Sequence, residues 1–172
     1  KEVGGLVTLH FASSSDASQQ VGLAFSASSL GVGPASDSSN GGPEADGAIY
    51  ASVAGPGTYT MPVSKLRGGF RYLTLFLNSA GTVDLDHVSL YFTAAPTMAN
   101  LRAYPNYFRS SDDLLNRIWY AGAYTVQMDT VAPDQGRVWP PPPGGGWDNS
   151  GLIGVGSSVL ADGAKRDRTV WP

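Results

Sequence analysis

The chain has 172 residues, enough for one domain with a sizeable core or for one domain and the beginning of another. With a formal net charge of −3 and no cysteine, the sequence excludes disulfides, thiol catalysis and cysteine metal sites, and it carries no basic surface for nucleic acid. Its 22 glycines and 12 prolines favour short strands and turns over helical bundles.

The composition favours a secreted protein. Lysine is scarce, whereas serine, threonine, glycine and tyrosine are abundant, as in many extracellular β proteins that lack disulfides. No stretch approaches the ~18 apolar residues that a membrane-spanning helix needs. The chain also begins at Lys1 and not at a methionine, which is consistent with a processed start. We therefore expect an extracellular protein with no membrane partner.

Residues 1–96 carry the period-two pattern of half-buried strands. Apolar residues alternate with polar or small ones, which places one face of each strand in a core and the other in water. The pattern predicts six strands, at 7–11, 21–28, 48–53, 57–61, 70–78 and 83–92. NSAG at 78–81 indicates a hairpin turn between the last two, and 31–47 indicates a long surface loop. We expect a jelly-roll-like β-sandwich domain.

At residue 110 the hydrophobic period changes to that of a helix, which we place at 110–130. Ser110 or Ser111 is predicted to be the N-cap, with the two following aspartates complementing the helix dipole. One stripe of the helix is formed by Leu115, Ile118, Trp119, Gly122 and Val126. Residues 97–109 then form a linker, and the sequence predicts a mainly β protein with an α segment.

Two further segments follow the helix. WPPPPGGGW at 139–147 is predicted to be a loop, stiff and then flexible, and 151–168 a second, glycine-loosened helix or a loop with a helical turn. The helix at 110–130 and the apolar residues 151–161 cannot cover each other's apolar surface. We therefore expect 110–172 to be the beginning of a larger helical domain.

The densest group of chemically capable side chains is DGAKRDRTVWP at 162–172. Carboxylates and guanidinium groups bind sugar hydroxyls in paired hydrogen bonds, and an indole stacks on C–H faces. A carboxylic acid can also serve as a general acid when burial or a like charge raises its pKa. The alternative is that KRDR is a solvated charge run with internal salt bridges, which is the more common case for such residue types.

Other residues indicate no metal site and no cofactor. His10 and His87 lie in strand patterns without nearby acidic or cysteine partners, so we predict strand-face residues and not metal ligands. Asp84 and Asp86 alternate with apolar residues and are predicted to share the wet face of a strand. The glycines of GLIGVGSS at 151–158 match neither a dinucleotide-binding nor a phosphate-binding loop.

The predicted elements follow one another in a distinctive order. A β-sandwich and a linker come first, followed by a helix that reads LLNRIWYAGAYTVQ at 114–127 and by the segment DGAKRDRTVWP at 162–172. This order resembles the α-L-rhamnosidases of glycoside hydrolase family 78 and their fungal relatives among the six-hairpin glycosidases. The resemblance is most specific from about residue 70 onward. It implies that the helix at 110–130 is the first helix of an (α/α)6 barrel, in an inverting hydrolase of terminal rhamnosyl residues that needs no cofactor.

The resemblance also implies roles for individual residues. In that family an Asp-x-x-x-Arg-Asp-Glu-Arg segment, followed by a tryptophan, lines the sugar pocket. Asp162 matches the sugar-binding aspartate, Arg166 the arginine and Trp171, with a one-residue shortening, the tryptophan that packs on the rhamnose ring. Arg168 stands where the family has its general-acid glutamate, so we expect the neighbouring Asp167 to donate the proton.

Inversion also needs a second carboxylate, ~6.5–9.5 Å from the acid, to activate water. No candidate follows Asp167, so we expect activity only together with the remainder of the barrel. A competing interpretation from another class is a non-catalytic carbohydrate-binding β-sandwich, with strand aromatic residues or the loop at 31–47 as the sugar platform. A third is a structural module that positions a partner domain.

Overall fold

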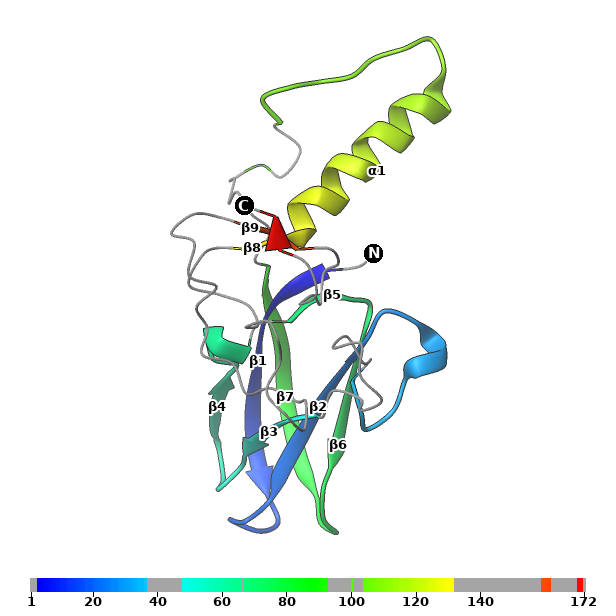
Figure 1. Cartoon of the computed structure of the whole chain (residues 1–172). Helices are drawn as coiled ribbons and strands as arrows, with labels where there is room; N and C mark the ends of the chain where they lie inside the picture. The colour runs from blue at the N-terminus through cyan, green and yellow to red at the C-terminus, as the bar shows by residue number, and fades with distance from the viewer. Residues whose placement is uncertain are drawn as a thin grey trace.

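The protein consists of a body of β-strands from which one long helix projects (Figure 1). The structure is a computed structural model that describes residues 3–36, 48–65, 67–92, 100, 104–131, 159–161 and 170–171. Its elements are β1 (Val3–Ser14), β2 (Gln20–Ser26), the 3₁₀ helix η1 (Ser29–Gly31), β3 (Ile49–Ser52), β4 (Gly57–Thr60), the 3₁₀ helix η2 (Val63–Lys65), β5 (Arg67–Phe70), β6 (Tyr72–Leu77), β7 (Val83–Phe92), α1 (Asp113–Asp129), β8 (Thr130–Val131), β9 (Val159–Ala161) and β10 (Val170–Trp171). The prediction of a mainly β protein with an α segment is confirmed.

All six predicted strand segments form strands. β7 spans the predicted residues 83–92, and β1 begins earlier than predicted, at Val3. The segment predicted as one strand at 70–78 is divided: β5 ends at Phe70 and pairs with β1, whereas β6 begins at Tyr72 and pairs with β2. The inward positions shift by one residue at this break, from Phe70 in β5 to Leu73 and Leu75 in β6, where the chain changes sheets.

Two antiparallel sheets pack on one shared core. In the first sheet β1 is central, with β7 along one edge and β4 and β5 along the other. In the second sheet β2 lies between β3 and β6. The buried side chains that join the sheets are Val7, Leu9, Phe11, Val21, Leu23, Phe25, Ile49, Ala51, Val53, Met61 and Phe70. Every second residue from Val7 to Phe11 in β1 and from Val21 to Phe25 in β2 is among them, as the alternating pattern predicts.

The turn at 78–81 does not close a hairpin, which corrects the sequence prediction. β6 pairs with β2 and β7 pairs with β1, so this turn carries the chain from the second sheet to the first. Gly81 adopts a φ of 151°, a conformation that favours glycine. The side-chain amide of the buried Gln19 donates to the carbonyl oxygen of Ser79 at 3.2 Å and fixes the turn. The turn residues at 78–81 therefore predicted that the chain reverses there, but not which strand β7 would pair with.

A second sheet-crossing turn, between β1 and β2, lies against the first. The amide of Ser15 donates to the carbonyl oxygen of Thr82 at 2.9 Å, and the amide of Thr82 donates to the hydroxyl of Ser15 at 2.9 Å. Within this turn, hydrogen bonds from the backbone amide and the hydroxyl of Ser18 lower the pKa of Asp16. Both crossings are thus fastened together at one end of the β body.

We predict that the shared core contributes most of the free energy of unfolding. Two leucines that differ in burial provide the test. Leu23 is fully buried in β2, whereas Leu30 in η1 is 97% exposed. Leu23→Ala should lower the free energy of unfolding by about 2–5 kcal/mol, because it leaves a cavity between the sheets. Leu30→Ala should change it by less than about 0.5 kcal/mol. Urea denaturation followed by tryptophan fluorescence measures both, and equal losses would contradict this assignment of the core.

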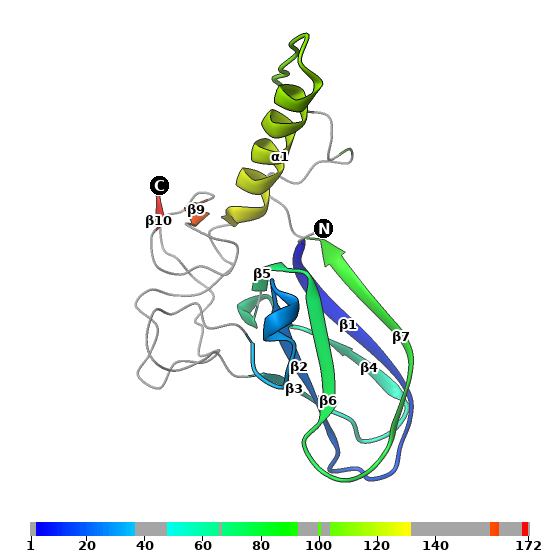
Figure 2. The ribbon, with the colours of Figure 1, turned by 90° about the vertical axis from the view of Figure 1, so that its right-hand side faces the viewer.

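α1 projects from the end of the β body at which β1 begins and β7 ends (Figure 2). It starts at Asp113, and its N-cap is Asp112, not Ser110 or Ser111 as predicted. The Asp112 carboxylate accepts hydrogen bonds from the amides of Leu114 and Leu115, at 2.8 and 3.3 Å. A carboxylate is favoured there because it accepts both amides and complements the helix dipole. The amide of Ser110 instead donates to the Asn116 side chain, at 2.7 Å.

We predict that Asp112→Ala frays the first turn of α1. Loss of an N-cap costs about 1 kcal/mol of helix stability. Hydrogen exchange at the amides of Leu114 and Leu115 should therefore become about five- to tenfold faster, and mass spectrometry or NMR can measure it. Ser111→Ala is the control and should leave these rates unchanged. Faster exchange in the control alone would show that the cap is misassigned.

The segment after α1 differs from its prediction. Residues 159–161 form strand β9, which pairs with β8 and β10 in a small antiparallel sheet, so the expected second helix is wrong at these positions. The rest of 151–168, the Pro/Gly stretch at 139–147 and most of the loop at 31–47 lie outside the described residues. Among the described residues, no helix is long and apolar enough to cross a membrane.

Candidate functional site

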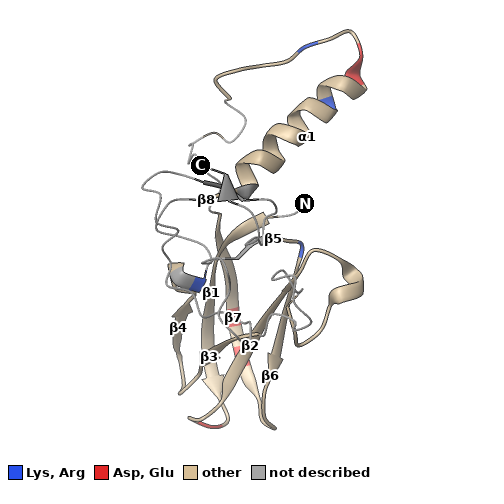
Figure 3. Ribbon diagram, in the orientation of Figure 1, with Lys and Arg blue, Asp and Glu red and all other residues tan. Residues whose placement is uncertain are grey.

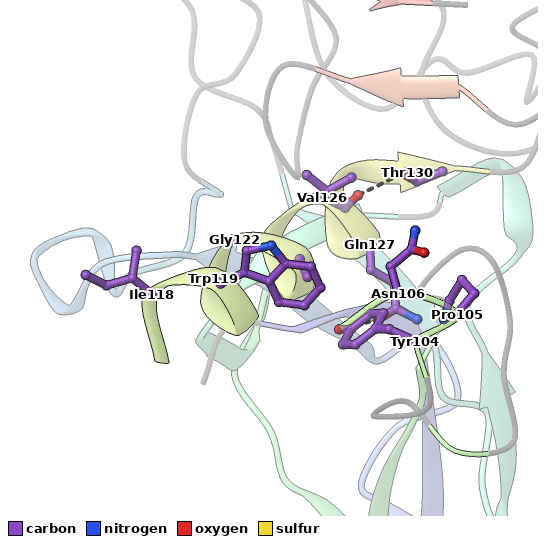
Figure 4. A pocket seen from close by; sticks show the side chains of 10 residues that line it. Tyr104, Pro105, Asn106, Ile118, Trp119, Gly122, Val126, Gln127 and Thr130 are labelled. Atoms are coloured by element: carbon purple, nitrogen blue, oxygen red, sulfur yellow. Dashed lines mark hydrogen bonds between the residues drawn. The ribbon is translucent and has the colours of Figure 1, made fainter. Parts of the chain in front are cut away.

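A pocket of about 610 Å³ opens beside the C-terminal half of α1 (Figure 4). The linker contributes Tyr104, Pro105 and Asn106, and α1 and the first residue of β8 contribute Ile118, Trp119, Gly122, Ala123, Val126, Gln127 and Thr130. The lining is mostly apolar, with a few polar groups at one end. Small-molecule sites in proteins commonly have this composition and size.

Trp119 lies at the centre of an aromatic cluster that attaches the linker to the helix. Its ring is stacked on that of Phe108, with centroids 6.2 Å apart, and contacts Tyr120 edge-on at 4.9 Å. Tyr104 approaches the same indole at 6.4 Å in a perpendicular arrangement. Each such pair stabilises by about 0.5–1.5 kcal/mol beyond the area it buries. The pocket wall is therefore built by residues both before and within α1.

The polar end of the pocket is built around Gln127. This amide is only 3% exposed, and its Oε1 atom accepts a hydrogen bond from the Tyr104 hydroxyl at 3.1 Å. One turn further, the hydroxyl of Thr130 donates to the carbonyl oxygen of Val126 at 2.7 Å. Since buried polar groups need partners, this network fixes the side chains at the end of α1. Sequence reasoning missed Tyr104 and Gln127, because neither belongs to a recognisable motif.

Most of the apolar stripe of α1 is uncovered among the described residues. Leu115 is 49% and Ile118 57% exposed, and a Cβ added at Gly122 would meet no atom within 4 Å. Of the helix side chains that the structure describes, only Gln127 and Met128 are buried. Tyr124 stacks on Phe92 at the end of β7, with centroids 6.4 Å apart. The helix is therefore anchored near its C-terminal end, and its apolar side forms an open surface.

We predict that this stripe binds hydrophobic dyes. Leu115→Gln combined with Ile118→Gln should lower the fluorescence of bound 8-anilinonaphthalene-1-sulfonate by about half or more. Because both side chains are exposed, the free energy of unfolding should change by less than about 1 kcal/mol. Leu30→Gln, at an isolated exposed leucine, is the control and should leave dye binding unchanged. A large loss of stability in the double variant would show that the stripe is packed.

Most residues proposed from the sequence to contact sugar lie outside the described part of the chain. These are Asp162, Arg166 and Asp167, and for Trp171 the structure describes the backbone alone. The flanking strands still constrain this segment, because Ala161 of β9 and Val170 of β10 are register partners. The segment at 162–169 therefore begins and ends at neighbouring points of one small sheet.

This small sheet borders the pocket. Thr130, which lines the pocket, is the register partner of Leu160, and Leu160 is in turn the partner of Trp171. Adjacent strands lie about 4.8 Å apart, so the backbone of Trp171 is roughly 10 Å from that of Thr130. The structure thus brings the end of α1 and the end of the 162–171 segment into one region.

The two histidines lie on strand faces, as predicted, but directly opposite each other. His10 and His87 are register partners with ring centroids 5.6 Å apart, and His10 Nδ1 lies 3.1 Å from the hydroxyl of Thr58. Asp84 accepts a hydrogen bond from the hydroxyl of Ser13. Within the described residues, no group of three or more histidines, cysteines and carboxylates could hold a metal ion.

No protein-family model matches the chain, and no curated protein matches it. The resemblance of the 114–127 helix and the 162–172 segment to rhamnosidases therefore stays a prediction. The arrangement around the end of α1 is the geometric feature on which a functional proposal can rest.

Proposed function

We propose that the chain is part of an inverting glycoside hydrolase similar to α-L-rhamnosidases: a jelly-roll-like β-sandwich joined to the first segment of an (α/α)6 barrel. Its substrates would be terminal rhamnosyl residues of plant or microbial glycosides outside the cell. One observation carries the proposal. The pocket at the end of α1 adjoins the small sheet whose β9–β10 connection contains the carboxylates and guanidinium groups of 162–168.

The open stripe of α1 supports the barrel part of the proposal. In an (α/α)6 barrel each helix packs against neighbours, and a barrel helix needs an apolar side that the β body does not cover. Leu115, Ile118 and Gly122 present such a side. We therefore propose that catalysis requires further helices packed on this stripe, and that these helices contribute the base that activates water.

The chemistry follows from the residue types in the 162–171 segment. Asp162 and Arg166 would hold the hydroxyls of the sugar in charge-assisted hydrogen bonds, and the Trp171 indole would stack on its C–H face. Asp167 would protonate the glycosidic oxygen as the bond to the anomeric carbon breaks, while water attacks from the opposite face.

Replacement of Asp167 tests this assignment. In the natural polypeptide that contains this sequence, Asp167→Asn should lower kcat on an aryl α-L-rhamnoside with a poor leaving group roughly 10²–10⁴-fold. A 2,4-dinitrophenyl rhamnoside should be affected far less, because its leaving group needs no proton. Asp86→Asn, at an exposed position of β7, is the control and should retain full activity.

The comparison of leaving groups separates catalysis from folding. A variant that merely unfolds would lose activity on both substrates in parallel. If Asp167→Asn keeps its activity on the poor leaving group, Asp167 is not the acid. If the unmodified polypeptide hydrolyses other aryl glycosides but no rhamnoside, the assigned substrate class is wrong.

A further inference from the structure

The outward face of the second sheet carries two aromatic side chains on either side of a glycine. Gly22 of the central strand β2 has Tyr50 of β3 and Phe76 of β6 as its register partners. The residues that precede and follow Gly22 in β2, Val21 and Leu23, belong to the core. Because side chains alternate along a strand, Gly22 and its two partners face away from the core.

The rings of Phe76 and Tyr50 form two sides of a corner: the Phe76 ring lies flat on the sheet, and the Tyr50 ring stands beside it. A Cβ added at Gly22 would lie 2.3–2.7 Å from three ring atoms of Phe76, so this ring lies against the β2 backbone, where the glycine leaves room. The Tyr50 ring stands at 80° to it, with centroids 6.0 Å apart. Tyr50 is 46% exposed. The two rings therefore enclose a corner that opens to solvent.

A row of polar side chains adjoins this corner. Two residues away on each strand, the outward positions are Ser52, Gln20 and Asn78, at a distance of about 7 Å along the strands. The side-chain amide of Asn78 donates to Gln20 Oε1 at 2.8 Å. This bond orients both amides and leaves the Gln20 amide group and the Asn78 oxygen as donor and acceptor for a ligand.

The face carries no formal charge. None of the residues of β2, β3 and β6 is lysine, arginine, aspartate or glutamate, and all three strands are uncoloured by charge in Figure 3. A phosphate or a carboxylate ligand would find no cation here. A ligand that fits needs one apolar face for the Phe76 ring, an edge that contacts Tyr50 and hydroxyls about 7 Å away for the amides.

We propose that this surface, defined by Tyr50, Phe76, Gln20 and Asn78, binds a neutral pyranose unit of a polysaccharide. A pyranose has a C–H face that stacks on an aromatic ring and hydroxyls at its rim that pair with amides. The surface belongs to the β body, so the proposal does not depend on the hydrolase assignment. If both hold, the surface is an ancillary site that keeps the protein on a polymeric substrate.

A purely structural role would explain part of the arrangement. An aromatic ring that covers a glycine in a neighbouring strand stabilises a sheet, which accounts for Phe76. It does not account for the exposed Tyr50 or for the amide pair beside it. The two roles are separable at Tyr50, because removal of a half-exposed ring should impair binding while leaving the fold intact.

The test is affinity electrophoresis of the 172-residue chain in native gels that contain arabinoxylan, galactan or mixed-linkage glucan. We expect retardation by at least one of these polymers. Tyr50→Ala should weaken that binding about tenfold, because it removes the ring that contacts the edge of the sugar, and Gln20→Ala should weaken it several-fold. Tyr50→Phe should keep most of the affinity. Tyr91→Ala, at an exposed tyrosine of the first sheet, is the matched control and should bind like the unmodified chain.

Two outcomes would overturn the proposal: no retardation by any of the three polymers, or equal retardation of Tyr50→Ala and the unmodified chain. Circular dichroism of each variant shows whether it is folded. Asp167→Asn should bind the polymer normally, and in the natural polypeptide Tyr50→Ala should hydrolyse a small aryl rhamnoside normally. Failure of the hydrolase proposal therefore leaves this one standing, and the reverse also holds.

Discussion

The contact between β1 and β2 across the core is the constraint on which the rest of the structure depends. Leu9 and Leu23 are both fully buried, and each belongs to the central strand of its own sheet. Because the two strands face each other, one side of every neighbouring strand is directed inward and the other outward. The outward directions of Tyr50 and Phe76 and the position of β7 beside the base of α1 follow from this arrangement.

The two candidate sites are held in place differently, because one lies on paired strands and the other between a helix and a linker. The corner on the second sheet is rigid, since its rings project from paired strands and the Phe76 ring lies on backbone. The pocket beside α1 is formed by a helix and a linker that are joined through stacked rings and one buried amide. If both proposals hold, the first site would hold a polymer while the second recognises a chain end.

Strand positions could be predicted from the sequence, because alternation of apolar residues is a local signal. The change of sheet between Phe70 and Tyr72 was not predicted. The inward positions shift by one residue there, but Tyr72 continues the alternation of Phe70 in the sequence although it faces outward, so the shift is hidden. The Asp112 cap was misplaced because serine and aspartate both suit that position, and only the fold decides which of them precedes the first turn. Of the candidate sites, the sequence named individual residues only for the 162–171 segment, and it indicated the strand aromatic residues only as a class. The tyrosines at 50 and 104 acquire their surroundings from residues far away in the chain.

The repeated changes of the chain from one sheet to the other also determine the order in which the fold can assemble. No strand of the two main sheets pairs with its immediate neighbour in sequence except β2 with β3, and β1 finds its longest partner, β7, only when residues 83–92 are available. The chain must therefore lose the entropy of closing long loops before these strand pairings can stabilise it. During synthesis the edge of β1 that pairs with β7 stays unpaired until the ribosome has released nearly the whole β body, whereas its other edge can pair earlier with β4 and β5. Such a chain is exposed to misassociation for longer than one built from adjacent hairpins.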